Sequence, residues 1–170
     1  MLRISKLTDY GTLIMSQMAR YPQRIHSAHE LAAALDLGIP TVSKILKRLA
    51  GHGLVAGVRG VNGGYSLSRQ PERISVADIV DALEEQPFGL TECSAATGLC
   101  DIEASCRIRA NWRTINRIVR TALEKVSVAS MVQPPTPEQR IGFDLPAASL
   151  VRRHTVPAKR LARTAKPAPQ

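Results

Sequence analysis

The chain has 170 residues, of which 44% are apolar, so it can bury a core in one domain or in two small domains with a tail. Its formal net charge of +9 favours a polyanionic partner such as nucleic acid, and the excess is concentrated in residues 1–70 and 131–170. The opening residues lack the apolar core of a signal peptide, and no charge-free apolar run is long enough to cross a bilayer. We therefore expect a cytoplasmic protein without a membrane partner.

A helix-turn-helix is predicted within the first fifty residues. Apolar residues recur at helical spacing over residues 7–19, which indicates a first amphipathic helix. Ser27 and Glu30 form a capping-box pair for a second helix, and Gly38 is expected to end it. A third helix is expected over residues 40–51. Two short helices joined by a short turn, the second of them basic, are typical of a helix-turn-helix.

The third helix has a polar and basic face opposite its apolar side. Short polar and cationic side chains suit the major groove, where they reach base edges and phosphates. The alternative interpretation is an ordinary solvated helix face. The predicted DNA contacts on this helix are Thr41, Ser43, Lys44, Lys47 and Arg48.

A β-wing is predicted directly after the third helix. Residues 55–58 and 65–67 have the character of short strands, and "RGVNGG" between them has turn chemistry. Arg59 and Gly60 are expected at the tip, where an arginine can enter the adjacent minor groove. The loop lacks the Lys-Ser/Thr ending of a nucleotide-binding P-loop, so a tight hairpin is the simpler interpretation.

Two further helices are predicted after the wing. Ser75 and Asp78 form a capping-box pair for the first, and Glu84 and Glu85 behind it are expected to be solvated. The second, within residues 107–130, has apolar residues at alternating steps of four and three, the seam of a helix that pairs with another helix. Packing on its own domain is the alternative; we expect a homodimer. The predicted dimer seam is Ile108, Trp112, Ile115, Val119, Ala122 and Val126.

The predicted fold class is mainly α with a small β-wing. A winged helix-turn-helix DNA-binding domain is expected over residues 1–70, followed by a connecting helix in residues 71–92 and a cysteine-rich loop in residues 93–106. A long dimerisation helix follows in residues 107–130. Residues 131–170 are basic and rich in Pro and Ala without any periodicity, which predicts a disordered tail.

All three cysteines lie in one short segment, as Cys93, Cys100 and Cys106. No Cys-x2-Cys occurs, which disfavours a zinc ribbon and a thioredoxin-like dithiol, and a reducing compartment disfavours disulfides. Thiolates are the preferred ligands of iron–sulfur clusters, although an odd cysteine count also fits a redox switch or incidental thiols. Cys106 is expected at the start of the long helix, before Arg107 and Arg109. That position favours an anionic cargo.

Several motifs occur in an order that resembles a known family. They are "KLTDYG", "TVSKILKRLAGHGLV", "RGVNGGYSLSR", "ISVADIVDALE", "TECS", the three-cysteine loop and "NWRTIN". Over about residues 1–132 the chain resembles the IscR/NsrR-type iron–sulfur winged-helix transcription factors, and more narrowly the regulators of the SUF assembly system. The resemblance implies a homodimer that binds palindromic promoter DNA. It also implies a cluster, [2Fe-2S] favoured and [4Fe-4S] possible, whose occupancy sets DNA affinity and commonly represses cluster-assembly genes.

The resemblance also bears on the ligands. The three cysteines match the family's ligand positions, but Arg109 stands where some members have a histidine ligand, and arginine does not ligate iron. In other members an aspartate near the start of the first helix reaches across from the partner subunit, and Asp9 matches it. Our hypothesis is that Asp9 completes the partner's cluster; the alternatives are that Asp9 only caps its helix, or that Thr8 caps the helix and Asp9 is exposed.

Two other functions remain open from the sequence. The first is a nitric-oxide- or redox-responsive repressor of the same family. The second is an enzyme or electron carrier that uses the three thiols, which would leave the basic helix and the wing without a task. We therefore expect no catalytic residues.

Overall fold

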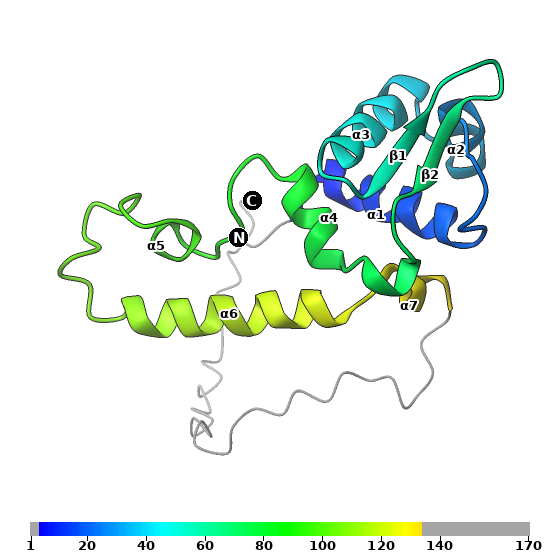
Figure 1. The fold of residues 1–170 in the computed structure, drawn as a ribbon. Helices are drawn as coiled ribbons and strands as arrows, with labels where there is room; N and C mark the ends of the chain where they lie inside the picture. The colour runs from blue at the N-terminus through cyan, green and yellow to red at the C-terminus, as the bar shows by residue number, and fades with distance from the viewer. Residues whose placement is uncertain (1–3, 134–170) are drawn as a thin grey trace, which may run out of the picture.

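The computed structural model describes residues 4–133 as a headpiece and an arm (Figure 1). The headpiece comprises residues 4–83 and 126–133, and the arm comprises residues 84–125. The elements, in chain order, are α1 (Lys6–Ala19), α2 (Ala28–Leu35), α3 (Ile39–Gly51), β1 (Val55–Val58), β2 (Gly64–Leu67), the 3-10 helix η1 (Pro71–Arg73), α4 (Val76–Leu83), α5 (Glu92–Ala95), α6 (Arg109–Lys125) and α7 (Val128–Val132). This arrangement confirms the predicted fold class. The predicted tail lies outside the described residues from residue 134 onward.

The turn between α2 and α3 differs from the sequence prediction. Ser27 caps α2 by accepting a hydrogen bond from the Glu30 N–H at 3.0 Å, but the Glu30 carboxylate pairs with Arg24 at 3.0 Å. The prediction that Gly38 ends α2 is wrong. Asp36 ends the helix in the left-handed region at φ 52°, which Asp tolerates better than most residues, and Gly38 is the N-cap of α3.

The wing forms as predicted and is tied to the α1–α2 loop. β1 and β2 pair antiparallel, with Val55 opposite Leu67. The His26 and Tyr65 backbones exchange two hydrogen bonds of 2.8 Å, which extend the hairpin by one bridge. A Cβ at Gly64 would lie 2.5 Å from the His26 carbonyl oxygen, so only glycine permits this close approach.

One hydrophobic core joins the helix-turn-helix to α4 and α7. Ile14 of α1 and Leu46 of α3 pack with Ile79 of α4 and Val128 of α7, and all four are fully buried. The sequence prediction treated α4 as a connecting helix outside the DNA-binding domain. The structure instead makes it part of the headpiece core, because its apolar face completes the layer that α1 and α3 begin.

The long helix of the arm ends earlier than predicted. α6 stops at Lys125, and Val126 accepts a hydrogen bond from the Val76 N–H at 2.8 Å, while the Val128 N–H donates to Ile74 at 2.8 Å. This isolated bridge extends the backbone, so residues 126–127 leave the helix. Ser127 then caps α7 by accepting from the Ser130 N–H at 3.2 Å.

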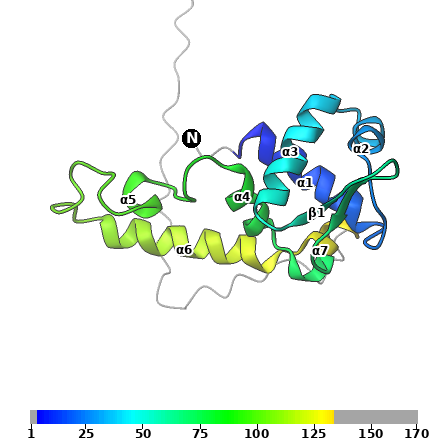
Figure 2. The same ribbon diagram turned by 45° about the horizontal axis from the view of Figure 1, so that its top comes forward.

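From the end of α4 the chain runs outward through α5 and the cysteine segment, and it returns to the headpiece along α6 (Figures 1 and 2). α6 has 17 residues and is therefore about 25 Å long. Arg120 joins α6 to α4 through two hydrogen bonds that it donates to Asp81, of 2.5 and 2.6 Å. Within α6 it also donates to Glu124, one turn further along, at 3.0 Å. The hydrogen bonds that Arg120 donates to Asp81 raise the pKa of Arg120. No helix within residues 4–133 combines the length and the apolar character of a bilayer-crossing segment.

Glu84 fixes the corner where the chain leaves the headpiece. Its Oε1 accepts a hydrogen bond from the Thr8 hydroxyl at 2.6 Å and another from the Ser5 N–H at 3.1 Å. The expectation that Glu84 is solvated is therefore wrong. Burial raises the pKa of Glu84, but the hydrogen bonds from Thr8 and Ser5 outweigh it and hold the pKa below its ordinary value.

If α4 belongs to the headpiece core, Leu83→Ala will destabilise the whole headpiece. Leu83 is 1% exposed, and removing its side chain should lower the free energy of unfolding by about 2–5 kcal/mol. Leu13→Ala is the matched control, because Leu13 is 46% exposed on α1. Urea unfolding followed by far-ultraviolet circular dichroism measures both. Equal effects of the two changes would contradict the shared core.

Glu84→Gln will reduce the stability lost on acidification. A carboxylate whose pKa is lowered by folding stabilises the native state above its unfolded pKa, and that contribution disappears as the pH falls through the folded pKa. The native protein should therefore be more stable than the variant near neutral pH, and the difference should shrink below an ordinary Glu pKa of about 4.3. Urea unfolding across this range measures it, with Glu72→Gln, at an exposed position of η1, as the control. A pH-independent difference would refute this role of Glu84.

Candidate nucleic-acid interface and thiol site

The outer face of α3 carries the cationic side chains that the sequence predicted. Lys44 and Lys47 are exposed, and Thr41 and Ser43 are half-buried beside them. The opposite face is fixed in the core by fully buried apolar residues, so the helix cannot rotate to hide its lysines. These buried residues are Val42, Ile45, Leu46 and Leu49.

Arg48 lies apart from the lysines of α3. Its Nη1 donates to the Leu83 carbonyl oxygen at 3.0 Å, and its Nη2 pairs with the Glu85 carboxylate at 3.2 Å. Position 48 flanks the buried row of α3, and the carbonyl groups at the end of α4 attract a cation. The structure thus turns Arg48 toward the end of α4, where the arm begins.

The tip of the wing is fully exposed. Arg59 and Gly60 both lie there, and Gly60 has φ 121°, which favours glycine. The Gly63 N–H donates to the Gly60 carbonyl oxygen at 2.9 Å and closes the turn. Val61 is the most exposed large hydrophobic residue of the described chain, and nothing in the sequence pointed to it beyond its place in the loop. The tip therefore offers one cation and one apolar side chain.

The three thiols lie at the far end of the arm. Cys93, Cys100 and Cys106 are free and half-buried, and Cys93 Sγ lies 3.4 Å from the Thr91 hydroxyl. Within residues 4–133 no three His, Cys, Asp or Glu side chains are gathered as a metal site. Three free thiols in one segment fit an iron–sulfur cluster by their donor chemistry. Because they are not gathered in this structure, a cluster would bind only if the segment drew them together.

The residues after the last cysteine differ from expectation. α6 begins at Arg109, so Cys106 lies in the turn before the helix rather than in its first turn, and the Arg109 N–H donates to its carbonyl oxygen at 3.4 Å. The Arg109 guanidinium pairs with Glu103, whose side chain is buried, while Arg107 is exposed. Much of the positive charge expected near the thiols is therefore balanced by Glu103.

Asp9 lies far from the thiols of its own chain. It is exposed in the first turn of α1, and Ser5 rather than Asp9 caps that helix, accepting from the Thr8 N–H at 3.2 Å. α1 belongs to the headpiece, whereas α5 lies at the opposite end of the arm in both ribbon views (Figures 1 and 2). Within one chain, the helix that carries Asp9 therefore lies apart from the helix that carries Cys93.

The predicted dimer seam on α6 is divided between two environments. Ile108 and Ile115 are exposed, and Ile118, which the sequence reasoning missed, extends the same apolar surface. Val119 instead lines a cavity of about 340 Å³ between α4, α6 and the linker, which is the segment of residues 84–91 between α4 and α5. Trp112 and Ala122 are half-buried, and Val126 belongs to the bridge after α6.

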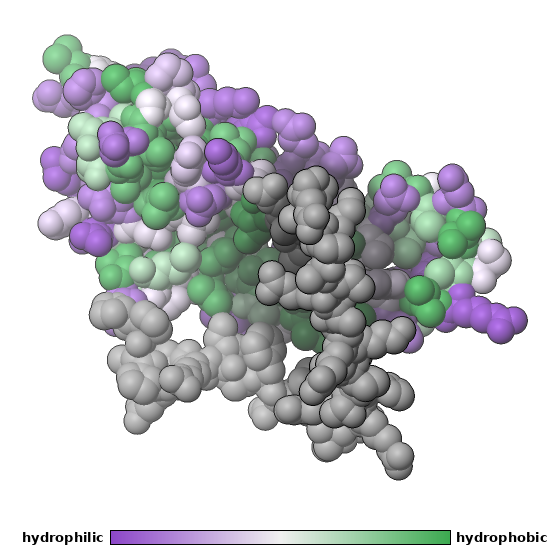
Figure 3. All heavy atoms as spheres, turned by 180° about the vertical axis from the view of Figure 1, so that it is seen from behind, coloured by the Kyte–Doolittle hydropathy of each residue, from purple (hydrophilic) through white to green (hydrophobic). Residues whose placement is uncertain are grey.

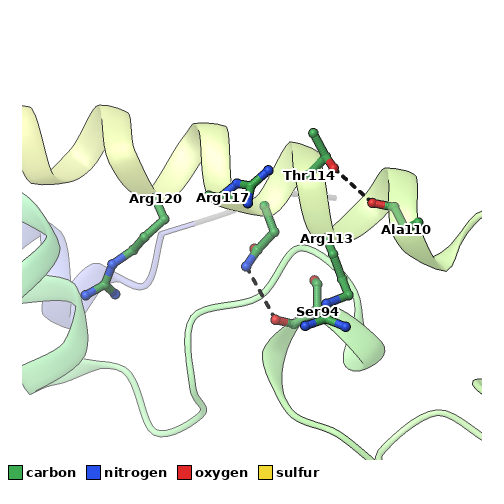
Figure 4. A pocket seen from close by; sticks show the side chains of 7 residues that line it. Ser94, Ala110, Arg113, Thr114, Arg117 and Arg120 are labelled. Carbon is green, nitrogen blue, oxygen red and sulfur yellow. Dashed lines mark hydrogen bonds between the residues drawn. The ribbon is translucent and has the colours of Figure 1, made fainter.

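A basic groove of about 530 Å³ separates α5 from α6 (Figure 4). Arg113 points toward Ser94 beside Cys93, and Arg120 points away toward α4. Asn116 lies between them and hydrogen-bonds to the Ser94 carbonyl oxygen at 3.4 Å. Sequence reasoning missed Asn116 as a site residue; its only signal was its place in the motif "NWRTIN".

The comparisons with known proteins agree with this geometry. The Rrf2 family, described as "Iron-dependent Transcriptional regulator", matches residues 4–134. BadM of Rhodopseudomonas palustris is 30% identical over 139 residues, which cover 82% of this chain and 86% of BadM. Among solved structures, B. subtilis CymR, the global cysteine regulator, has a TM-score of 0.61 at 25% identity, covering 78% of this chain and 97% of CymR. T. potens IscR has a TM-score of 0.59 at 26% identity, covering 77% and 86%. The chain belongs to the Rrf2 family of transcriptional regulators.

Proposed function

We propose that this regulator senses iron–sulfur status: a cluster held by Cys93, Cys100 and Cys106 sets the affinity of the headpiece for promoter DNA. The observation that carries the proposal is the position of the thiols. All three are free and lie on one arm, both ends of which are fixed in the headpiece. A change at the thiols can therefore reach α3 along the backbone of the arm and through the contacts that attach the arm to the headpiece.

DNA binding is assigned to α3 and the wing. Lys44 and Lys47 would neutralise phosphates that flank the major groove, Thr41 and Ser43 would face base edges, and Arg59 at the wing tip would enter the minor groove; the exposure of Lys44, Lys47 and Arg59 supports these roles. A homodimer would present two such headpieces to a palindromic site. The exposed isoleucines of α6 support pairing of two arms, because a row of apolar residues on a solvated helix is costly without a partner.

Each thiol residue has a defined role in this proposal. The three cysteines would bind as thiolates to a [2Fe-2S] cluster, with [4Fe-4S] as the other possibility, and the cluster would supply redox and oxygen sensitivity. Asp9 of a second chain is proposed as the fourth ligand. Because α1 and α5 lie apart in both ribbon views, such a bond would form between two chains and would make ligation depend on the dimer.

We further propose repression of cluster-assembly genes, including a SUF system, in the cytoplasm. The motif resemblance and the likeness to T. potens IscR support this regulon. The likeness to B. subtilis CymR, a global cysteine regulator, shows that this fold also occurs in a regulator of a different process. Titration of the holo-protein with iron chelator, oxygen or nitric oxide distinguishes the signals by which agent first changes DNA affinity.

Lys44→Ala and Lys47→Ala will each weaken promoter binding and its salt dependence. A lost phosphate contact should lower the slope of log K against log salt by about 0.9. Lys6→Ala on α1 is the matched control and should leave the slope unchanged. Because Arg48 is bound to Leu83 and Glu85, Arg48→Ala should change the slope less than either lysine variant. Fluorescence anisotropy with DNA from upstream of the protein's own gene measures the binding of all four variants. Unaltered binding by both lysine variants would refute the interface.

Serine at all three cysteine positions will abolish cluster uptake and change DNA affinity. Protein purified without oxygen should contain iron and sulfide and show charge-transfer absorption, whereas the triple variant should be colourless. Asp9→Ala should alter the Mössbauer spectrum, with exposed Glu72→Ala as its control. Native protein without iron, or a triple variant that binds its operator as native protein does, would overturn the proposal. An unchanged Asp9→Ala spectrum would remove only the fourth ligand.

A further inference from the structure

Two polar side chains of α6 hold residues 90–106, which contain the three cysteines and are called the thiol segment below. Arg109 and Asn116 are seven positions apart, so they lie on the same face of the helix two turns from each other. Each contacts a different part of the segment. Asn116 holds the part around Cys93, and Arg109 holds the part that contains Cys100 and Cys106.

Asn116 fixes the turn around Cys93 from both sides. Its Oδ1 accepts a hydrogen bond from the Leu90 N–H at 3.1 Å, and its Nδ2 donates to the Ser94 carbonyl oxygen at 3.4 Å (Figure 4). Thr91 adds local order, since its N–H donates to the Ser94 Oγ at 3.0 Å. The backbone before and after Cys93 is thus attached to one amide group of α6.

Glu103 connects the second part of the segment to Arg109. Its Oε2 accepts a hydrogen bond from the Gly98 N–H at 2.6 Å, and its Oε1 pairs with the Arg109 guanidinium. Gly98 precedes Cys100, and Glu103 lies midway between Cys100 and Cys106. The carboxylate therefore draws this stretch into a closed turn against the start of α6.

The thiol segment has little apolar packing that could replace these contacts. Leu99, Ile102 and Ile108 are all more than half exposed, and apolar residues lie beside polar ones at the surface of this end of the arm (Figure 3). Glu103 is 8% exposed, the lowest value within residues 93–106. A buried carboxylate is costly unless it is paired, so losing Arg109 should open the turn.

We infer that Arg109 and Asn116 are the positioning residues of the thiol segment, and that Arg109 acts through Glu103. The inference rests on the proposed function insofar as it concerns a cluster. Neither residue is a ligand. Together they keep the backbone of the three cysteines attached to one rigid helix, so that only the short stretches between the anchors move when the thiols converge.

The experiment uses full-length protein reconstituted without oxygen. Arg109→Gln and Asn116→Ala should each shorten the half-time of cluster loss to excess iron chelator by about tenfold or more, as changes in outer-shell partners of metal ligands do. Arg117→Gln and Asn111→Ala are matched controls on exposed positions of α6 and should behave as native protein. Arg109→Lys keeps a cation for Glu103 and should restore most of the half-time and the native visible circular dichroism.

Amide hydrogen exchange of cluster-free protein gives a readout independent of the cluster. Residues 90–106 should exchange faster in Arg109→Gln and in Asn116→Ala than in native protein, with the headpiece unchanged. Chelation half-times or exchange rates equal to those of the controls would overturn the inference. Native protein that takes up no iron, together with faster exchange in both variants, would overturn the proposed function and leave the anchoring intact.

Discussion

The arm is attached to the headpiece at both of its ends, and the rest of the structure depends on this double attachment. At its start, the Glu84 carboxylate accepts hydrogen bonds from Ser5 and Thr8 at the head of α1. At its end, the bridge of residues 126–128 with residues 74–76 delivers Val128 into the core. A helix fixed at one end only could swing freely. Because both ends are fixed, a displacement of α6 must strain either the α4 corner or the core.

The carboxylates of this chain determine which of its arginines are available to a partner. Arg48, Arg109 and Arg120 are paired with Glu85, Glu103 and Asp81, respectively. Each pair joins two segments of the structure rather than two neighbours in one helix turn, so these arginines serve the fold of the arm. Among the residues that the structure describes, no carboxylate pairs with Lys44 or Lys47, so lysines supply the free cationic surface of α3 and can bind phosphate as flexible point charges.

Arg48 and Glu84 both make hydrogen bonds at the end of α4, where the arm begins. Arg48 reaches the Leu83 carbonyl oxygen from α3, and Glu84 reaches Thr8 in α1. The first residues of the arm are thus in contact both with the helix that carries the lysines and with the helix that carries Asp9. This contact gives a physical basis for the proposed coupling, since any force on the linker acts on both helices.

The sequence by itself determined α1 to α4, the wing, the course of α6 apart from its end, and the side of α3 that carries the lysines. Helical spacing, the Ser75–Asp78 capping box and the "RGVNGG" turn located the helices and the wing, because these signals depend on residues a few positions apart. It also placed Lys44 and Lys47 on the exposed side of α3, since burial of one helix face exposes the other. The clustering of the three cysteines needed no structure at all.

Only the tertiary structure decided how distant groups pair. The contact of Arg109 with Glu103 and that of Arg48 with the Leu83 carbonyl oxygen leave no periodic pattern in the sequence. Any arginine of a chain could pair with any of its carboxylates or free carbonyl groups, so the sequence does not single out these partners. The end of α6 at Lys125 was hidden for the same reason: residues 126–128 continue the helical pattern, but their backbone bonds to residues 74–76, some fifty positions away. Local spacing specifies a helix, whereas competition from a distant partner for the same N–H and C=O groups decides where it stops.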